Sequence, residues 1–230
     1  MSLNRFERRV FSVAAGCYAL SVCTIIAAGI ISASMYPVHF DWAYTVMSAL
    51  ASQKHNPEGA AYFAFGFVGS LLLLWPSITW IALDRSASGR LSRIGVRALR
   101  LGILSGALLG VERLVFLSFS DSIHKAHEVL ALLCFLNLYA GVLFIYFHRL
   151  RGRTDSRWPA VLIFAPLLAI GLNQIGLYFG QRDLGWVDTS WREKGIPFWM
   201  SFAFWQWLAA LTLWIGIGHL CLSARPARRA

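Results

Sequence analysis

The chain has 230 residues, of which 57% are hydrophobic and only 14% are charged, a composition typical of a membrane protein. Its formal net charge is +10. The basic residues gather beside long apolar runs, where membrane topology and attraction to anionic lipid headgroups explain them without a nucleic-acid partner. The four cysteines all fall inside apolar runs, so the sequence predicts no disulfide framework.

Six apolar runs predict the fold. Each is close to the roughly 20 residues that a helix needs to cross the hydrocarbon core of a bilayer. Long, continuous apolar runs favour helices over a β-barrel, because a helix satisfies its own backbone hydrogen bonds in lipid. We therefore expect an all-α, polytopic membrane protein, a six-transmembrane-helix bundle that forms a single membrane domain over residues 1–230. The runs cover residues 10–33, 60–83, 98–119, 125–147, 158–180 and 197–221.

The basic residues predict how this bundle is oriented. Fifteen of the 21 Lys and Arg residues lie in four segments, which alternate with segments that are poor in basic residues. By the positive-inside rule the four segments are cytoplasmic. Both termini are then cytoplasmic (N-in/C-in), and the protein is a multi-pass protein of the plasma (bacterial inner) membrane. The four segments carry Arg5, Arg8 and Arg9; Arg85, Arg90, Arg93, Arg97 and Arg100; Arg149, Arg151, Arg153 and Arg157; and Arg225, Arg228 and Arg229.

Two further features follow in chain order. The longest loop joins the first two runs on the non-cytoplasmic side, and we expect a short interfacial helix within its residues 41–51. In the third run, Gly102, Gly106 and Gly110 are spaced four residues apart. This spacing places them on one helical face, where a neighbouring helix can approach closely.

Polar residues at membrane depth are the candidates for function, because a charge at the bilayer centre costs about 2.5–3.5 kcal/mol on insertion scales. Most lie toward the non-cytoplasmic ends of the runs, which predicts a polar cavity open to that side. Four are candidate catalytic residues: Glu112, His124, His127 and Ser48. Six are candidate binding residues for a lipid or its headgroup: Arg113, Glu58, Glu128, Asn173, Gln174 and Gln206.

Glu112 and Arg113 are adjacent, so their side chains diverge by about 100° around the helix and need not pair with each other. We expect each to find a partner on another span. A buried ion-pair network that fixes helix register is the alternative to a role in substrate contact.

The start of the fourth run offers a candidate metal site. Asp121, His124 and His127 are spaced three residues apart, and such a set can bind a divalent metal such as zinc. The spacing lacks the i, i+4 histidine pair of zinc helices, and a helix cap with an interfacial anchor explains the same residues. The cofactor is therefore left open between a metal, a bound lipid and none.

Three local patterns together resemble the Frag/DRAM/Sfk family of six-helix membrane proteins and related bacterial membrane domains of unknown function. The resemblance implies six helices and, for some eukaryotic members, roles in lipid remodelling, lipid asymmetry or glycolipid-anchor maturation. Gln206 stands where the family commonly has an acidic residue. The patterns are Met47-Ser48-Ala49-Leu50 with Asn56-Pro57-Glu58 and Phe63-x-Phe65-Gly66-Phe67; His124 to Glu128; and Phe202 to Trp207.

Three functions remain open from the sequence. The first is lipid or lipid-headgroup handling in the non-cytoplasmic cavity, with membrane lipids as partners. The second is a membrane-embedded hydrolase or transferase that uses the His and Glu residues, with Ser48 as nucleophile. The third is a structural or assembly subunit, whose outer aromatic residues contact another membrane protein.

Overall fold

The structure is a computed structural model that describes residues 4–84, 89–115, 124–151, 161, 164, 168–172, 190–193, 195 and 197–225. The elements in this part of the chain are helical. Five of them are long and apolar enough to cross a membrane, which indicates an integral membrane protein. These five are α1 (Arg5–Ser34), α3 (Ala60–Ala82), α4 (Arg90–Val115), α5 (His124–Arg151) and α8 (Phe202–Ser223). The shorter elements are α2 (Met47–Leu50), α7 (Ser190–Glu193) and a 3-10 turn, η4 (Phe198–Met200).

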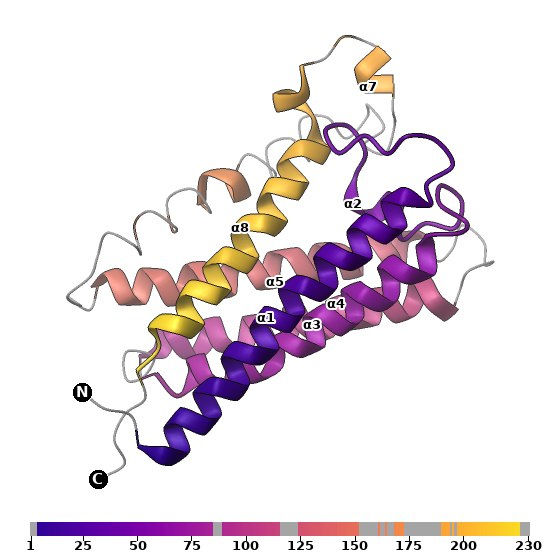
Figure 1. Cartoon of the computed structure of the whole chain (residues 1–230). Helices are drawn as coiled ribbons and strands as arrows, with labels where there is room; N and C mark the ends of the chain where they lie inside the picture. The colour runs from indigo at the N-terminus through magenta and orange to yellow at the C-terminus, as the bar shows by residue number, and fades with distance from the viewer. Residues whose placement is uncertain are drawn as a thin grey trace.

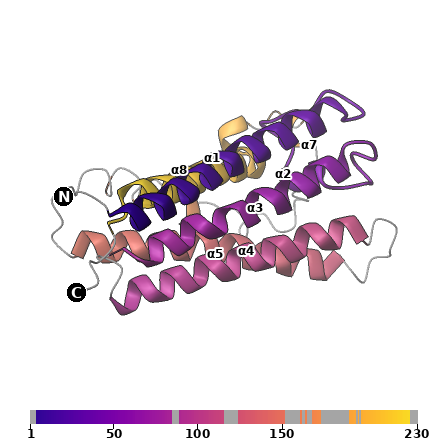
Figure 2. The ribbon, with the colours of Figure 1, turned by 60° about the horizontal axis from the view of Figure 1, so that its bottom comes forward.

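The long helices pack in chain order (Figures 1 and 2). Helix α1 packs against α3, α3 against α4 and α4 against α5, while α8 contacts α1, α3 and α5. The start of α1 and the end of α8 lie at the same end of the bundle, which we name the proximal end. Helices α2 and α7 lie at the opposite, distal end (Figure 1). The positive-inside prediction makes the distal end non-cytoplasmic.

Hydrogen bonds between the helices establish their directions. At the proximal end, the guanidinium of Arg149 in α5 contacts Asp84 just after α3 and Ser223 at the end of α8. At the distal end, Gln206 in the first turns of α8 contacts Met47 in α2. Helix α5 therefore ends at the proximal end, and α8 begins at the distal end.

The helix boundaries differ from the predicted runs mainly in the third. Helix α4 begins at Arg90, well before the predicted start at 98. Arginine is a good helix former, and its long side chain can extend from a helix end toward water, so the basic segment continues the helix. Of the predicted helix within 41–51, only Met47–Leu50 is helical. Most of the predicted run 158–180 lies outside the described residues.

The glycine face of α4 lies between two neighbouring helices, as the four-residue spacing predicts. A Cβ atom added to Gly102 would lie 2.7 Å from the Leu138 side chain of α5. Added to Gly110, it would meet Val68 of α3. Closer to the proximal end, the backbones of α4 and α5 are in direct contact. A Cβ on Gly95 would lie 2.7 Å from the carbonyl oxygen of Gly141, and the reverse distance is 2.8 Å.

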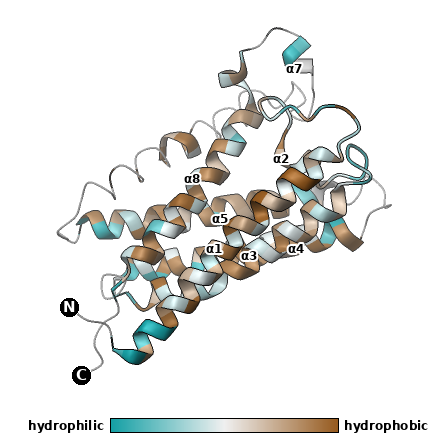
Figure 3. Ribbon diagram, viewed as in Figure 1, coloured by the Kyte–Doolittle hydropathy of each residue, from teal (hydrophilic) through white to brown (hydrophobic). Residues whose placement is uncertain are grey.

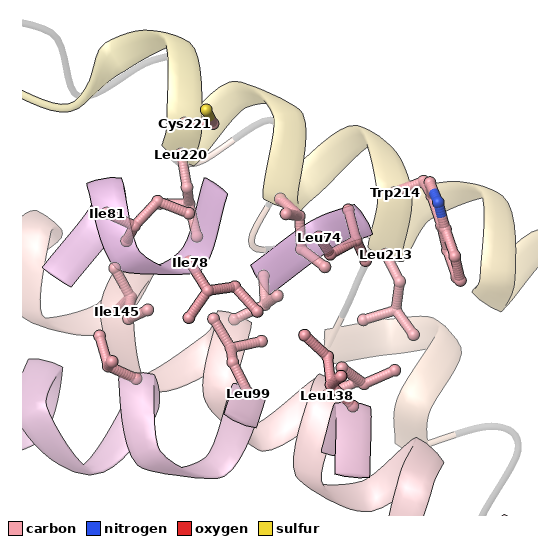
Figure 4. Close-up of a cluster of buried hydrophobic side chains, with 14 of the residues drawn as sticks. Leu74, Ile78, Ile81, Leu99, Leu138, Ile145, Leu213, Trp214, Leu220 and Cys221 are labelled. Atoms are coloured by element: carbon pink, nitrogen blue, oxygen red, sulfur yellow. The ribbon is translucent and has the colours of Figure 1, made fainter. Parts of the chain in front are cut away.

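A core of aliphatic side chains fills the space between α3, α4, α5 and α8 (Figure 4). Leu99 of α4 and Leu74 of α3 are fully buried there, and Leu213 of α8 closes the same cluster. Many other large apolar side chains, such as Leu72, Leu104 and Leu211, are exposed. Brown, apolar positions therefore extend over the outside of the helices (Figure 3), as expected for surfaces that face lipid tails.

Small polar residues join the helices within the apolar region. The Ser21 hydroxyl of α1 lies 2.9 Å from the Ser70 hydroxyl of α3, and the indole N–H of Trp214 in α8 donates to the same Ser21 oxygen at 3.2 Å. The Ser77 hydroxyl of α3 donates to the carbonyl of Ala14 in α1 at 2.8 Å. Because lipid removes most of the hydrophobic drive for helix association, such bonds help to select the helix pairs, at about 0.6 kcal/mol each.

Candidate functional site

A charged cluster lies at the distal end of the α4–α5 hairpin. Glu112 and Arg113 are in the last turn of α4, and His127 is in the first turn of α5. The Nε–H of Arg113 donates to His127 Nδ1 at 2.9 Å. Glu112 Oε2 lies 3.3 Å from the same ring nitrogen and 3.7 Å from Arg113 Nε. The side chains of all three residues are mostly buried, with 12–20% of their surface exposed.

One ring nitrogen of His127 has two partners that make opposite demands. Arginine keeps its protons, so Arg113 Nε is a donor and requires Nδ1 to be an acceptor. A Glu112 carboxylate is an acceptor and requires a proton on Nδ1. His127 with its proton on Nε2 alone therefore bonds to Arg113. His127 with a proton on Nδ1, as the other neutral tautomer or as the cation, bonds to Glu112 instead and gives up the bond from Arg113. The cluster has two hydrogen-bonding states, which differ in whether Nδ1 carries a proton.

The two adjacent residues of α4 do approach each other. Their Cα–Cβ directions diverge around the helix, but the long Arg113 side chain bends back, so that its Nε comes within salt-bridge distance of Glu112. Both residues also contact a residue of another span, His127, as we expect from the sequence. Arg113 lies at the C-terminus of α4, where a cation is favoured by the helix dipole.

The loop between α1 and α3 brings a second histidine toward this cluster. His55 is half-buried in that loop. Burial lowers the pKa of His55 below its usual value of 6.5, and the charges of Lys54 and Arg113 lower it further. The distal end thus carries Arg113, His127 and Glu112 on the α4–α5 hairpin, with Lys54 and His55 in the loop before α3.

Asn56 fastens this loop to α1. Its amide nitrogen donates to the Ser32 carbonyl at 2.9 Å and to the Ser32 hydroxyl at 2.8 Å. Its amide oxygen accepts from the Gly59 N–H at 3.2 Å. The Asn56 side chain leaves no room for a Cβ on Gly59, which would lie 2.7 Å from the Asn56 oxygen. The loop next to His55 is therefore held by a fully buried amide.

Helix α8 is joined to the same loop by two side chains. Gln206 Oε1 accepts from the backbone N–H of Met47 at 2.7 Å, so it caps the start of α2. The Trp207 indole N–H donates to the Thr45 carbonyl at 3.1 Å. The structure therefore places Gln206 in a structural contact, and its role in ligand binding stays a prediction.

The other candidate residues are placed as follows. Ser48 is half-buried in α2, and Glu58 and Glu128 are exposed. His124 is the first residue of α5, but its side chain lies outside the described part of the chain. Asp121, Asn173 and Gln174 also lie outside the described residues. Within the described residues, no three His, Cys, Asp or Glu side chains are grouped closely enough to hold a metal ion.

An apolar groove of about 510 Å³ lies beside α8 at the distal end. The rings of Trp42 and Trp207 meet there edge to face, with centroids 4.9 Å apart. Trp199, one of the outer aromatic residues predicted to contact a membrane-protein partner, is close by and 57% exposed. That interaction stays a prediction. The groove is lined by Trp42, Ala43, Phe198, Phe204, Trp207, Leu208 and Leu211.

The proximal end holds a second buried charged network, around Arg149, which the sequence did not reveal. The sequence indicated only that Arg149 belongs to one of the basic segments used to predict the orientation of the bundle. The structure buries it, and its Nη2 lies 2.5 Å from Asp84 Oδ2. Its Nη1 donates to the Ser223 hydroxyl at 2.6 Å. Near this pair, the Tyr146 hydroxyl lies 2.7 Å from His219 Nδ1. The available signal was an acidic residue, Asp84, that directly precedes a basic segment.

The distal end therefore carries a charged cluster on α4 and α5, a loop that is held to α1, and an apolar groove beside α8. Comparisons of the chain with protein-family models, with curated proteins and with solved structures found no match.

Proposed function

We propose that the protein binds the phosphate-bearing headgroup of a membrane lipid at the charged cluster of Arg113, His127, Glu112 and His55. The observation that carries this proposal is the contact between Arg113 Nε and His127 Nδ1. That contact orients the guanidinium through Nε, which leaves its terminal nitrogens as donors for phosphate oxygens. Arginine donors in this fork arrangement match phosphate well.

The remaining groups fit the same ligand. Lys54 adds positive charge from the loop, and His55, whose lowered pKa keeps the ring neutral near pH 7, can donate a hydrogen bond from its ring N–H. A bound phosphate would offset the repulsion between Arg113 and His55, which contributes to the lowered pKa of His55. The apolar groove beside Trp42 and Trp207 supplies a surface on which an acyl chain can lie.

We further propose that the chain crosses the membrane six times with both termini cytoplasmic. Support comes from helix direction: α5 ends at the proximal end and α8 begins at the distal end. The chain between them has to pass from one end of the bundle to the other, and its residues 158–180 form an apolar run of sufficient length. The basic residues gather at the proximal end, which supports a cytoplasmic location for that end.

The test is native mass spectrometry of the purified protein with two added lipids that share the same acyl chains. Phosphatidylethanolamine carries a phosphate, and diacylglycerol does not. Wild type should retain the first and not the second. Arg113→Gln should weaken phosphatidylethanolamine binding about tenfold or more, because a charge-assisted hydrogen bond contributes about 1.5–3 kcal/mol.

Arg192→Gln is the matched control, since Arg192 is also at the distal end and also pairs with a carboxylate, Asp41, at 2.9 Å. It is 71% exposed, so its loss should leave lipid binding unchanged. Arg113→Lys, which keeps the charge, checks that the Gln variant has not merely lost its fold. If folded Arg113→Gln binds the lipid as well as wild type does, the proposal is wrong.

A membrane-bound hydrolase is the second candidate, favoured by the 3.3 Å contact between His127 Nδ1 and Glu112. With the proton on Nδ1, Glu112 orients the ring and Nε2 becomes a general base. Ser48 is the candidate nucleophile. This function predicts that Ser48→Ala stops turnover of a phosphate or acyl ester and leaves lipid binding intact. Equal turnover by Ser48→Ala and wild type would exclude Ser48 from the chemistry.

A further inference from the structure

The first turns of α1 carry a basic hollow at the end of the molecule opposite the charged cluster. Its volume is about 450 Å³, and it is lined by Arg5, Arg8, Arg9 and Ser12. These positions are spaced three, four and seven residues from the first, so they share one face over two helical turns. Figure 3 shows the same turns as the hydrophilic start of an otherwise mostly apolar helix.

This arginine face points away from the bundle. The buried residues of α1, among them Ala14 and Ser21, lie on the other side of the helix. Gly16 continues the arginine face by one turn beyond Ser12, and a Cβ added there would meet nothing within 4 Å. Within the described part of the chain, therefore, the face is open to the membrane and its interface with water.

The charge on the first turns of α1 is strongly positive. Glu7 is the acidic residue of the first turn, and it is held at the helix cap. Its Oε2 accepts from the Asn4 N–H at 2.9 Å, while the Asn4 side chain accepts from the Glu7 N–H at 2.8 Å. Glu7 therefore stays on the cap, and the positive end of the helix dipole adds to the field of the arginines.

We propose that this hollow binds the phosphate of an anionic phospholipid at the proximal membrane surface. The guanidinium groups of Arg5 and Arg9 and the Ser12 hydroxyl supply the donors, and Arg8 adds positive charge. Two apolar neighbours favour a lipid over a soluble phosphate: Phe6 is 72% exposed and Val13 is 59% exposed. An acyl chain attached to the bound phosphate would lie against these side chains, directly below the headgroup. This site is independent of the proposed function at the distal end.

Helix α4 provides a matched control. Its start carries Arg90, Arg93 and Arg97, which are exposed and spaced three, four and seven residues apart. They contribute to the same positive charge at the proximal end of the bundle, but the hollow is lined only by residues of α1. If anionic lipid is attracted only by the general positive charge, binding should depend equally on the arginines of α1 and of α4. If the hollow is a discrete site, binding should depend on the arginines of α1.

The experiment measures lipid binding to the full-length protein in detergent micelles by native mass spectrometry, so orientation in the membrane does not affect the result. The lipids are phosphatidylglycerol and phosphatidylcholine with identical acyl chains. We expect Arg5→Gln/Arg8→Gln/Arg9→Gln to weaken phosphatidylglycerol binding by at least about tenfold, given roughly 1 kcal/mol for each basic residue near an anionic surface. The variant Arg90→Gln/Arg93→Gln/Arg97→Gln should change it by less than about twofold, because none of these arginines lines the hollow and a twofold change is smaller than the roughly 1 kcal/mol of one contacting basic residue.

One further variant and one competitor sharpen the result. Arg9→Lys keeps the charge but removes the forked donor, so it should give a smaller, measurable loss and show that folding is intact. Glycerol phosphate, which is the headgroup without acyl chains, should fail to displace phosphatidylglycerol at equal concentration. Equal losses in the two triple variants, equal retention of the two lipids by wild type, or displacement by glycerol phosphate would each overturn the proposal.

Discussion

Arg149 Nη2 on α5 lies 2.5 Å from Asp84 Oδ2 just after α3, with both side chains almost fully buried. The other carboxylate oxygen of Asp84 accepts the backbone N–H of Arg225 at 3.2 Å. Arg149 also donates to Ser223 in the last turn of α8. One ion pair therefore joins the proximal ends of three helices that are distant in sequence.

We expect Arg149→Leu to destabilise the protein by about 3–5 kcal/mol, because it leaves the Asp84 carboxylate buried without its cation. The measurement is the free energy of unfolding in detergent micelles. The double variant Asp84→Leu/Arg149→Leu removes both charges and should lose less stability than Arg149→Leu alone. Arg151→Leu is the control, since Arg151 is exposed in the same turn of α5. A double variant that is no more stable than Arg149→Leu would contradict this account.

Two glycine-to-alanine changes should have opposite effects on stability. Gly95→Ala places a Cβ 2.7 Å from the Gly141 carbonyl oxygen and should force α4 and α5 apart, at a cost of about 1–3 kcal/mol. Gly16→Ala meets nothing within 4 Å in α1 and should stabilise its helix by about 0.5–1 kcal/mol. Melting temperatures of the two variants, measured in the same detergent, check the signs. A stabilised Gly95→Ala would show that the two backbones do not meet as described.

Asn56→Ala should release the loop between α1 and α3. The substitution removes the donors to Ser32 and the acceptor for Gly59 N–H from a fully buried position, and each unsatisfied group costs about 1–3 kcal/mol. We expect faster proteolysis within residues 35–59 and a lower melting temperature. The matched control is Asn137→Ala, which removes only a bond to the Leu133 carbonyl within α5. Equal proteolysis of the two variants would argue against the anchoring role of Asn56.

Acidification should destabilise the protein through His55. Burial and the charges of Lys54 and Arg113 lower the pKa of His55 below 6.5, so the folded state binds a proton less readily than the unfolded state. The stability contribution is complete above pH 6.5 and is lost as the pH falls from there through the lowered pKa. His55→Gln should flatten the dependence of melting temperature on pH in this window. His39→Gln, at an exposed position in the same loop, should leave the wild-type dependence in place.

Much of the helical fold could be predicted because apolar length and glycine spacing are local properties of the chain. Apolar length predicts the span that starts at Ala60. Glycine spacing predicts that Gly102 and Gly110 of α4 lie where neighbouring helices pack closely. The contacts between Ser21 and Ser70 could not be predicted in the same way. A serine in an apolar run carries no signal of which distant helix it meets, since that depends on how both helices are rotated in the packed bundle.

The site could be predicted only in part, for a related reason. Glu112, Arg113 and His127 stand out as polar residues at membrane depth, and the short α4–α5 connection makes their approach easy to foresee. The partner of Gln206 is a backbone N–H, and backbone donors are not visible in a residue pattern. The burial of Arg149 could not be predicted, because the positive-inside rule counts charge near a span and does not distinguish a buried arginine from an exposed one.

The buried amide of Asn56 separates the closing of the first loop from the chemistry of the charged cluster. The stretch Asn56-Pro57-Glu58-Gly59 holds together through its own geometry, with Asn56 filling the space beside Gly59 and bonding to Ser32 of α1. None of these contacts involves Glu112, Arg113 or His127. Residues 112, 113 and 127 can therefore be exchanged to alter the charge and hydrogen bonding of the cluster while the loop stays closed.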